Sequence, residues 1–210
     1  MEVLGRSDDT GRRSGDRVAY RPGNRFIEVA IDILAETGRT DFTVQQLVSR
    51  AKASLRGFYQ HFANKDELLI ALSGDIIASS AHTWRAEVND LDATEALRLV
   101  IDRVGMPPAS DAQHGINRAL SLYYEHLAQV RPKDFAELLL PLHALIRDIL
   151  ERGAAEGVVS TEMTSDAGAA VVMQTILGTQ RMQSLGVQLT GTPVDTAMVH
   201  AFCMHGLTRT

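Results

Sequence analysis

The sequence predicts an all-α fold of about nine helices, and three observations support this class. Apolar residues recur at three- and four-residue intervals in almost every segment after residue 23, which is the spacing of an amphipathic helix. Alternation with a period of two is confined to residues 186–190, a stretch too short for a sheet. Prolines and glycines fall between the periodic segments, where helices begin and end.

Bulk composition favours a folded cytoplasmic protein. The chain has 210 residues, 45% of them apolar, which is enough to bury a core. Its single cysteine excludes an intramolecular disulfide and fits a reducing compartment. No apolar run approaches the roughly 20 residues that cross a bilayer, and residues 1–25 are polar and arginine-rich, unlike a secretory signal. We therefore expect no membrane association.

The first segment, residues 1–22, is predicted to be a flexible arm. It contains five arginines and four acids, with no helical periodicity. Arginine-rich arms can enter a DNA minor groove. The near-cancellation of charge favours a solvated tail instead.

Two helices are expected next. Residues 24–38 place apolar side chains on one helical face, with Asn24 as the expected N-cap and Gly38 as the residue that ends the helix. The second helix begins at Thr43, whose hydroxyl caps it while Gln46 reaches back in a capping box.

A short third helix and a long fourth one follow. Ser54 is the expected cap of a helix that runs to about His61. Asn64 and Glu67 repeat the capping box and open a helix from Lys65 to about residue 88. Helix-period apolar residues continue in five further segments: residues 92–105, 111–130, 134–156, 165–186 and 194–208.

Residues 43–65 have a charge pattern that differs from the rest of the chain. The chain has a formal net charge of −5, yet this stretch has four basic residues and no acid. Two short helices joined by a tight turn and braced by a third form a helix-turn-helix unit, whose second helix lies in the DNA major groove. Acids there would repel phosphates, so their absence indicates a DNA-facing surface. A helical corner with a solvated basic face is the alternative that periodicity alone leaves open.

Residues 24–69 resemble the DNA-binding domain of TetR-family transcriptional regulators. The family's signature ends in a Tyr-x-x-Phe-x-x-Lys-x-x-Leu run, which Tyr59, Phe62, Lys65 and Leu68 match. The remaining chain is similar to the family only in helical layout and length. The resemblance implies three parts: a flexible Arg-rich arm, a helix-turn-helix DNA-binding domain and an effector-binding and dimerisation domain, at residues 1–22, 23–69 and 70–210.

Carried over position by position, the resemblance implies nine DNA contacts. Arg56 suits a bidentate contact with guanine, and Gln60 suits adenine or phosphate. Lys65 lies in the first turn of a helix, where free backbone N–H groups also attract phosphate. The expected contacts are Thr43, Ser54, Leu55, Arg56, Gly57, Tyr59, Gln60, His61 and Lys65.

Two positions depart from the family pattern. Lys52 occupies the turn position usually held by glycine, where a left-handed backbone favours glycine. Gly57 replaces a commoner Thr or Ala and weakens the recognition helix by about 0.5–1 kcal/mol relative to Ala.

The C-terminal domain is expected to form a homodimer through the last two helices. A dimer supplies a second half-site about 34–36 Å from the first, so that a pseudo-palindromic double-stranded DNA operator is recognised. Residues 165–186 offer small side chains (Gly168, Ala169, Ala170, Gly178), and residues 194–208 offer large apolar ones. An intramolecular core is the alternative role for these helices.

The middle helices are expected to enclose a small, largely apolar effector. Aromatic and polar side chains lie among apolar ones there, as they do in pockets for small molecules. The expected ligand-binding residues are Arg118, Tyr123, Tyr124 and His143, although an aromatic residue on a helix face more often belongs to the core.

No cofactor and no metal site is expected. His200 and Cys203 can share a helix face, but His205 points elsewhere and a fourth ligand is missing. The chain also lacks a catalytic grouping or phosphate loop, so an all-α enzyme with His126 or His143 as base is the least favoured function. The leading hypothesis is a ligand-responsive DNA-binding regulator, a repressor, and an effector-independent DNA-binding regulator is the alternative.

Overall fold

The computed structural model describes residues 23–189 and 191–208, and the arm predicted for residues 1–22 lies outside them. The described chain forms nine helices and no strand, which confirms the all-α class. Their bounds are α1 (Asn24–Thr37), α2 (Val44–Arg50), α3 (Leu55–Tyr59), α4 (Lys65–Glu87), α5 (Ala93–Gly105), α6 (Asp111–Val130), α7 (Pro132–Ala155), α8 (Ser165–Ser184) and α9 (Thr196–Leu207).

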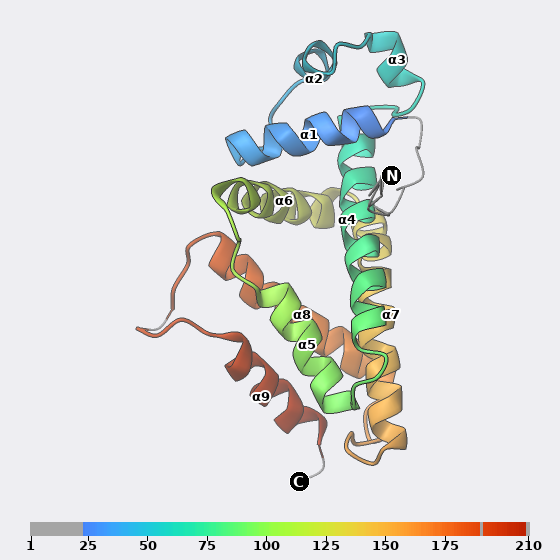
Figure 1. Ribbon diagram of the computed structural model, residues 1–210, viewed down its shortest axis with the longest axis vertical. Helices are drawn as coiled ribbons and strands as arrows, with labels where there is room; N and C mark the ends of the chain where they lie inside the picture. Colours follow the sequence, from blue (N-terminus) through green and yellow to red (C-terminus); the bar gives the residue numbers. More distant parts are fainter. Residues whose placement is uncertain (1–22, 190, 209–210) are drawn as a thin grey trace, which may run out of the picture.

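The helices α1–α3 occupy one end of an elongated molecule (Figure 1). The two longest helices, α4 and α7, pack against each other along its length, and α6 crosses beneath α1. At the other end, α5 packs against α7, α8 and α9. None of the described helices is both long enough and apolar enough to cross a membrane.

Local hydrogen bonds begin the helices of the N-terminal end largely as predicted. Thr43 and Gln46 form the complete capping box of α2, and Ser54 Oγ caps α3 by accepting from the Gly57 N–H at 3.0 Å. Asn64 caps α4 alone, because the Glu67 carboxylate accepts from the guanidinium of Arg131, the residue between α6 and α7.

The predicted N-cap of α1 is wrong by one residue. Gly23 is the N-cap with φ of 112°, and Asn24 is already the first helical residue. The left-handed backbone at Gly23 is open to glycine and costly for a residue with a Cβ atom. At the other end of α1, Gly38 adopts φ of 62° and ends the helix, as predicted.

Two apolar cores hold the molecule together, and the boundary between them does not coincide with residue 69. One core joins α1–α3 to the first half of α4 and to parts of α6 and α7. The other joins α5 to the second half of α7 and to α8 and α9. The helix α4 runs without a break from Lys65 to Glu87. It therefore connects the end of the molecule formed by α1–α3 to the middle of the molecule.

The crossing of α1 and α6 is close because a glycine lies at it. A Cβ atom added to Gly115 on α6 would lie 2.5 Å from the Ala35 carbonyl oxygen of α1 and 3.0 Å from that of Leu34. Real Cβ atoms essentially never approach so closely. Gly115 therefore sets the spacing between the N-terminal end and the rest of the molecule.

Candidate nucleic-acid interface

The turn between α2 and α3 has the geometry of a helix-turn-helix. Its central residue, Lys52, has φ of 48° and is the one non-glycine residue with positive φ among the described residues. The Ala53 N–H donates to the Val48 carbonyl at 2.9 Å, which closes the end of α2. The structure thus places a lysine in the left-handed conformation that glycine usually provides.

Helix α3 divides into a buried face and an exposed face. Phe58 is fully buried and packs edge-to-face against Phe26 of α1, with ring centroids 5.5 Å apart. Leu55 and Tyr59 on the other face are 41% and 56% exposed. Seven of the nine predicted DNA contacts lie on or beside this exposed face, and only Gly57 among them is half-buried. These seven are Ser54, Leu55, Arg56, Gly57, Tyr59, Gln60 and His61, and exposed Thr43 lies at the start of α2.

The four cations of residues 43–65 do not share one environment. Arg50 forms a bidentate ion pair with Glu36 of α1, and this hydrogen bonding lowers the pKa of that carboxyl. Lys65 donates from Nζ to the Thr40 carbonyl at 2.9 Å and lies 5.5 Å from the Phe42 ring centroid. Within the described chain, Arg56 and Lys52 form no ion pair, so their charges face solvent.

The placement of Lys65 differs from the simple phosphate contact that the sequence suggested. Its ammonium group is half-buried and ties α4 to the segment between α1 and α2. One of its three N–H donors is used inside the molecule, and the others remain for a phosphate. The sequence gives little warning of this bond, since its partner is a backbone carbonyl far along the chain.

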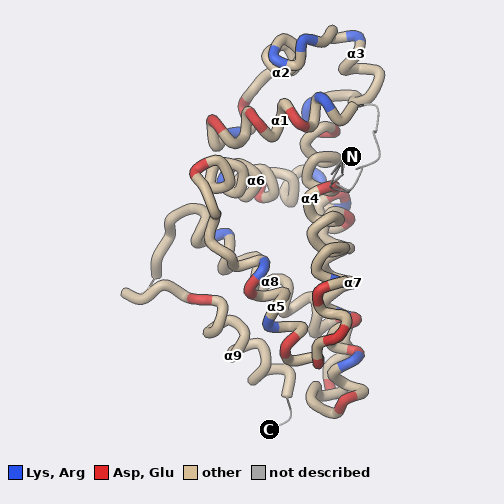
Figure 2. Tube along the Cα trace, in the orientation of Figure 1, with Lys and Arg blue, Asp and Glu red and all other residues tan. Residues whose placement is uncertain are grey.

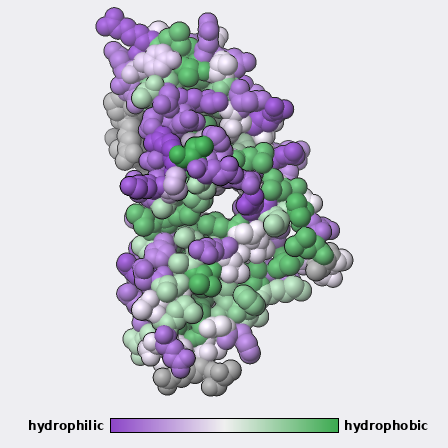
Figure 3. Space-filling model, turned by 180° about the vertical axis from the view of Figure 1, so that it is seen from behind, coloured by the Kyte–Doolittle hydropathy of each residue, from purple (hydrophilic) through white to green (hydrophobic). Residues whose placement is uncertain are grey.

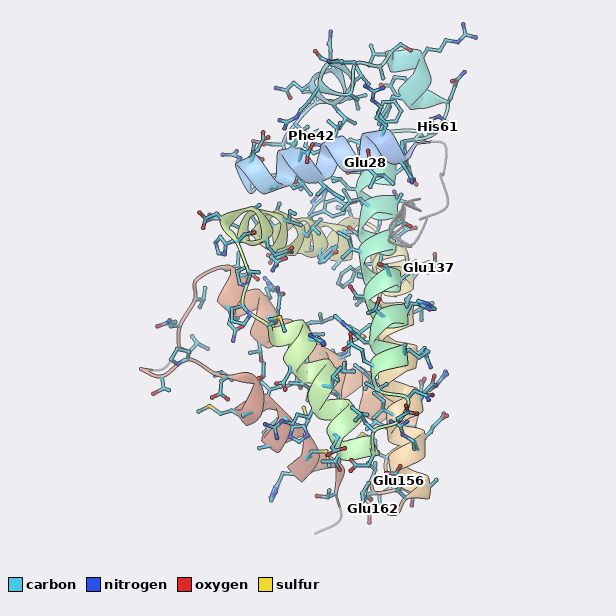
Figure 4. All side chains as sticks on the ribbon, viewed as in Figure 1. Glu28, Phe42, His61, Glu137, Glu156 and Glu162 are labelled. Carbon is cyan, nitrogen blue, oxygen red and sulfur yellow. The ribbon has the colours of Figure 1, made fainter. Side chains whose placement is uncertain are left out.

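Acids are absent from the surface formed by α2 and α3 (Figure 2). The acids nearest to it are Asp41, in the segment just before α2, and the acids of α1 and of the first turn of α4. Figure 4 shows Phe42 and His61 at this end of the molecule, whereas Glu156 and Glu162 lie at the opposite end. A polyanion that approaches α3 therefore meets the exposed charges of Lys52 and Arg56 without an acid on the same surface.

A cavity of about 410 Å³ lies between α4, α5, α6, α7 and α8. It is mainly apolar, with Trp84 and Tyr124 as its aromatic members. Burial raises the pKa of the Tyr124 hydroxyl, so this side chain carries no charge at neutral pH. Figure 3 shows the surface hollowed between the part that carries α6 and the part that carries α8.

Of the four predicted ligand-binding residues, Tyr124 lines this cavity and three do not. Tyr123 is buried away from the cavity, and its hydroxyl donates to the Asp66 carbonyl at 3.3 Å. Arg118 is exposed beside Gly38, at the crossing of α1 and α6. His143 Nε2 lies 3.1 Å from the Asp166 carbonyl oxygen at the start of α8.

Sequence reasoning missed several polar and aromatic residues of the cavity. Trp84 of α4, Asn117 of α6 and Gln180 of α8 all line it. Helical periodicity gave no signal, because it does not say which turn of each helix faces a space that five helices share. The single tryptophan of the chain was the one compositional signal available.

The last two helices keep large apolar side chains exposed. On α9, Met198 and Phe202 are 50% and 70% exposed, and on α8, Val171 and Met182 are 53% and 42% exposed. Figure 3 shows hydrophobic surface around the loop between these helices.

The small residues predicted for the dimer interface fall into two groups, one exposed and one packed inside the chain. A Cβ atom added to Gly178 would meet nothing within 4 Å, so that position is open. Gly168 and Ala169 instead pack inside the chain, Gly168 beside Leu150 and Leu207. The alternative of an intramolecular core therefore holds for part of α8.

No group of three or more His, Cys, Asp or Glu residues in the described part of the chain is placed to hold a metal ion. Cys203 is buried in the C-terminal core, and burial raises the pKa of its thiol.

The capped pair α2–α3, the left-handed turn at Lys52 and the bracing helix α1 define a helix-turn-helix protein. Residues 26–72 match the bacterial regulatory proteins of the TetR family. Over these residues the chain is similar to the DNA-binding part of that family. No curated protein sequence matches the chain.

Solved structures share the fold over most of the chain. The fatty acid degradation regulator FadR from Bacillus halodurans is 19% identical, with a TM-score of 0.71 over 88% of this chain and 98% of that one. FadR from Bacillus subtilis, solved in complex with stearoyl-CoA, is 19% identical, with a TM-score of 0.68 over 88% and 97%. The regulatory protein TetR from Rhodobacter sphaeroides is 18% identical, with a TM-score of 0.64 over 89% and 99%.

Proposed function

We propose that the chain is a repressor that binds a pseudo-palindromic operator as a homodimer and is released by a small, largely apolar effector. The observation that carries this proposal is the exposed, acid-free face of α3 at one end of a molecule with an apolar cavity at its centre. The first feature suits a polyanion and the second suits a small molecule. A ligand-responsive repressor requires both the DNA-facing surface and the effector cavity.

The exposed face of α3 enters the major groove in this proposal. Arg56 hydrogen-bonds a guanine edge, and Gln60 hydrogen-bonds adenine or phosphate. The N-caps Thr43 and Ser54 approach the phosphates at the helix starts, where free N–H groups point outward. Lys65 contributes a phosphate contact while it keeps its bond to the Thr40 carbonyl.

A second copy covers α8 and α9. Phe202 and Met198 are too exposed for a stable monomer surface, since contiguous exposed apolar patches mark interaction sites. A groove of about 570 Å³ between α8 and the loop that follows it, with Gly178 and Met182 in its lining, offers these side chains a place to insert. Two helices from each copy then form a four-helix bundle.

The effector acts by changing the angle or separation of the two recognition helices. The cavity is lined by Ile76, Ile77 and Trp84 of α4, the helix that begins beside α3. It is also lined by residues of α6, the helix that crosses α1 at Gly115. A ligand that binds the cavity better in one arrangement of these helices shifts the dimer toward it, away from the spacing that fits both half-sites.

The apolar character of the effector is supported by the cavity lining. One relative of similar fold was solved with stearoyl-CoA, and its effector has a long apolar part. The cavity here measures about 410 Å³, which falls within the usual range for small-molecule pockets.

Genomic footprinting with the purified protein tests the proposal. A regulator protects a small number of sites, each with two half-sites about one helical turn apart. A mobility-shift titration on those sites then gives the affinity, and Arg56→Ala removes the preference for them. Protection without sequence preference, or none at all, would contradict the function; an all-α enzyme would give the second result.

A further inference from the structure

A second cavity, of about 430 Å³, adjoins the first. It lies between the end of α5, the start of α6, the end of α8 and the segment that precedes α9. The two cavities share the loop after α5 and one residue from each of α6 and α8: Met106, Pro107, Pro108, Asn117 and Gln180. Two consecutive prolines stiffen this shared wall.

Both cavities are lined mainly by apolar groups, with hydrogen-bonding side chains among them. The first is lined by Trp84, Leu142 and Leu177 and by other apolar side chains of five helices, with Ser80, Gln113 and Ser121 among its polar members. The second is lined by Pro193 and Val194 as well as by the shared loop after α5, and its hydrogen-bonding side chains include His114, Asn117, Gln180, Gln183 and Ser184. A molecule that spans both cavities therefore contacts apolar side chains in each and passes the carboxamides of Asn117 and Gln180 where the cavities join.

The carboxamides at the junction have unused hydrogen-bonding capacity. Asn117 Oδ1 accepts from Gln113 Nε2 at 2.7 Å, which leaves the Asn117 amide N–H groups without a partner among the described residues. Gln180 Nε2 donates to Ser184 Oγ at 2.9 Å, which leaves the Gln180 carbonyl oxygen free as an acceptor. A donor and an acceptor thus face the junction, and together they match a neutral polar group.

The charges in both linings are already compensated. Arg103, the one cation in the first lining, donates to Glu87 at 2.7 and 3.0 Å. In the second lining, the Asp195 carboxylate caps α9 by accepting from the Met198 N–H at 2.8 Å. No unpaired Lys or Arg of the described chain lines either cavity, so a carboxylate or phosphate would be buried without a counter-ion.

We propose that the effector is an uncharged amphipathic molecule, with its apolar part in the first cavity and a hydrogen-bonding head group that reaches the second between Asn117 and Gln180. This inference rests on the proposed function, because it assigns a chemical class to the effector of the same site. It also assigns Asn117 and Gln180 as the residues that select the head group.

Three probes with the same eight-carbon chain test the head-group preference: octanamide, octan-1-ol and octanoate. Their affinities for the full chain are measured by isothermal titration calorimetry at mildly alkaline pH, where the acid is ionised. We expect octanamide to bind at least about tenfold more tightly than octanoate, because the amide pairs with the junction and the carboxylate does not.

Three variants assign the effect to the two cavities. Asn117→Leu combined with Gln180→Leu weakens the binding of octanamide by about tenfold and leaves the affinity for octanoate unchanged. Gln180→Lys places a cation at the junction and reverses the preference in favour of octanoate, an outcome that a loss of structure would not produce. Leu177→Trp fills the first cavity and abolishes binding of all three probes. Glu137→Gln, on the exposed side of α7, is the control and leaves every affinity unchanged.

The outcomes separate the inference from the proposed function. If octanoate binds the wild type as tightly as octanamide, or if Gln180→Lys leaves the order unchanged, the head-group assignment is wrong and an apolar effector still stands. If no probe binds while operator DNA does, both the assignment and the effector cavity are wrong.

Discussion

Arg56 and Lys65 are both basic residues of the DNA-binding domain, yet their surroundings differ. Arg56 is exposed on α3 and has no ion-pair partner in the described chain. We expect Arg56→Ala to relax discrimination at one base pair by about 1–3 kcal/mol without changing thermal stability, because a bidentate contact with guanine is lost. Competition binding against operators substituted at each position measures this.

Lys65→Ala should behave differently, because its ammonium group also donates to the Thr40 carbonyl. It should lower the thermal midpoint, weaken binding to all sequences alike and reduce the salt slope by about 1. A sequence-dependent effect of Lys65→Ala, or a uniform effect of Arg56→Ala, would contradict these roles.

Lys52 holds a left-handed backbone that only glycine adopts without strain. Because φ at this position is 48°, we expect Lys52→Gly to raise the free energy of unfolding by roughly 1 kcal/mol. Lys52→Ala is the matched control, since it removes the same charge and keeps the Cβ atom. Denaturant unfolding compares the two variants, and equal stability for both would show that the backbone at this turn is not strained.

Glu36 and Arg50 connect α1 to α2, and the pair makes stability depend on pH. The hydrogen bond from Arg50 lowers the Glu36 pKa below its ordinary value of 4.5. A carboxyl with a lowered pKa stabilises the fold above its unfolded-state pKa, and this contribution is lost as pH falls through the folded-state value. Glu36→Gln should therefore be less stable than wild type at neutral pH, and the difference should disappear in acid.

Unfolding midpoints measured from neutral pH down to below pH 4.5 test this dependence. Glu28→Gln, an exposed acid of the same helix without an ion pair in the described chain, serves as the control and should follow the wild-type curve. A Glu36→Gln deficit that persists unchanged in acid would mean that the ion pair is not its cause.

At the scale of the helices, Gly115 determines how closely α6 approaches α1. A Cβ atom here would lie 2.5 Å from the Ala35 carbonyl oxygen, so Gly115→Ala must push the two helices apart. We expect a loss of roughly 1–3 kcal/mol in stability, as for other substitutions that overfill a packed site, together with a change in operator affinity without effector. Gly74→Ala on α4 is the control, because its Cβ atom would meet only the end of the Leu138 side chain, at 3.4 Å. Unchanged operator affinity in a folded Gly115→Ala protein would show that α6 does not position α1.

The helices and most of their ends could be predicted from the sequence, because caps depend on neighbours within one turn. Thr43 and Ser54 meet their partners three residues away, so local pattern is sufficient. The prediction that Asn24 caps α1 was wrong because Gly23 beside it, with a left-handed backbone, serves as the cap. The class of DNA-binding surface was predictable for the same reason, since α2, the turn and α3 are contiguous in the chain.

The cavity could not be predicted residue by residue, because its lining depends on the relative rotation of five helices. Tyr123 and Tyr124 are neighbours with the same chemistry, yet Tyr123 packs toward Asp66 and Tyr124 lines the cavity. Asn117 and Gln180 become partners only when α6 and α8 are brought together. Lys65 belongs with these cases, since its acceptor lies on a different segment.

At the scale of the whole molecule, the proposed recognition of an operator depends on a second copy of the chain. Hydrophilic surface predominates over the end that carries α1–α3, whereas exposed apolar side chains gather on α8 and α9 (Figure 3). Phe202 is 70% exposed, and its burial in a dimer would contribute about 1.5–3 kcal/mol per copy. A charge at this position cannot be buried against its own symmetry mate.

Phe202→Glu should therefore convert the dimer to a monomer, with its own fold and thermal midpoint little changed because the side chain contributes little to the core of a single chain. Sedimentation equilibrium measures the change in mass. Operator affinity should fall far more than affinity for a single half-site, because one copy contacts one half-site and the avidity of two linked contacts is lost. Leu140→Glu on α7, where the side chain is 57% exposed, is the control and should leave both mass and affinity unchanged. A Phe202→Glu protein that remains dimeric would place the interface elsewhere, and a monomer with full operator affinity would contradict the requirement for two recognition helices.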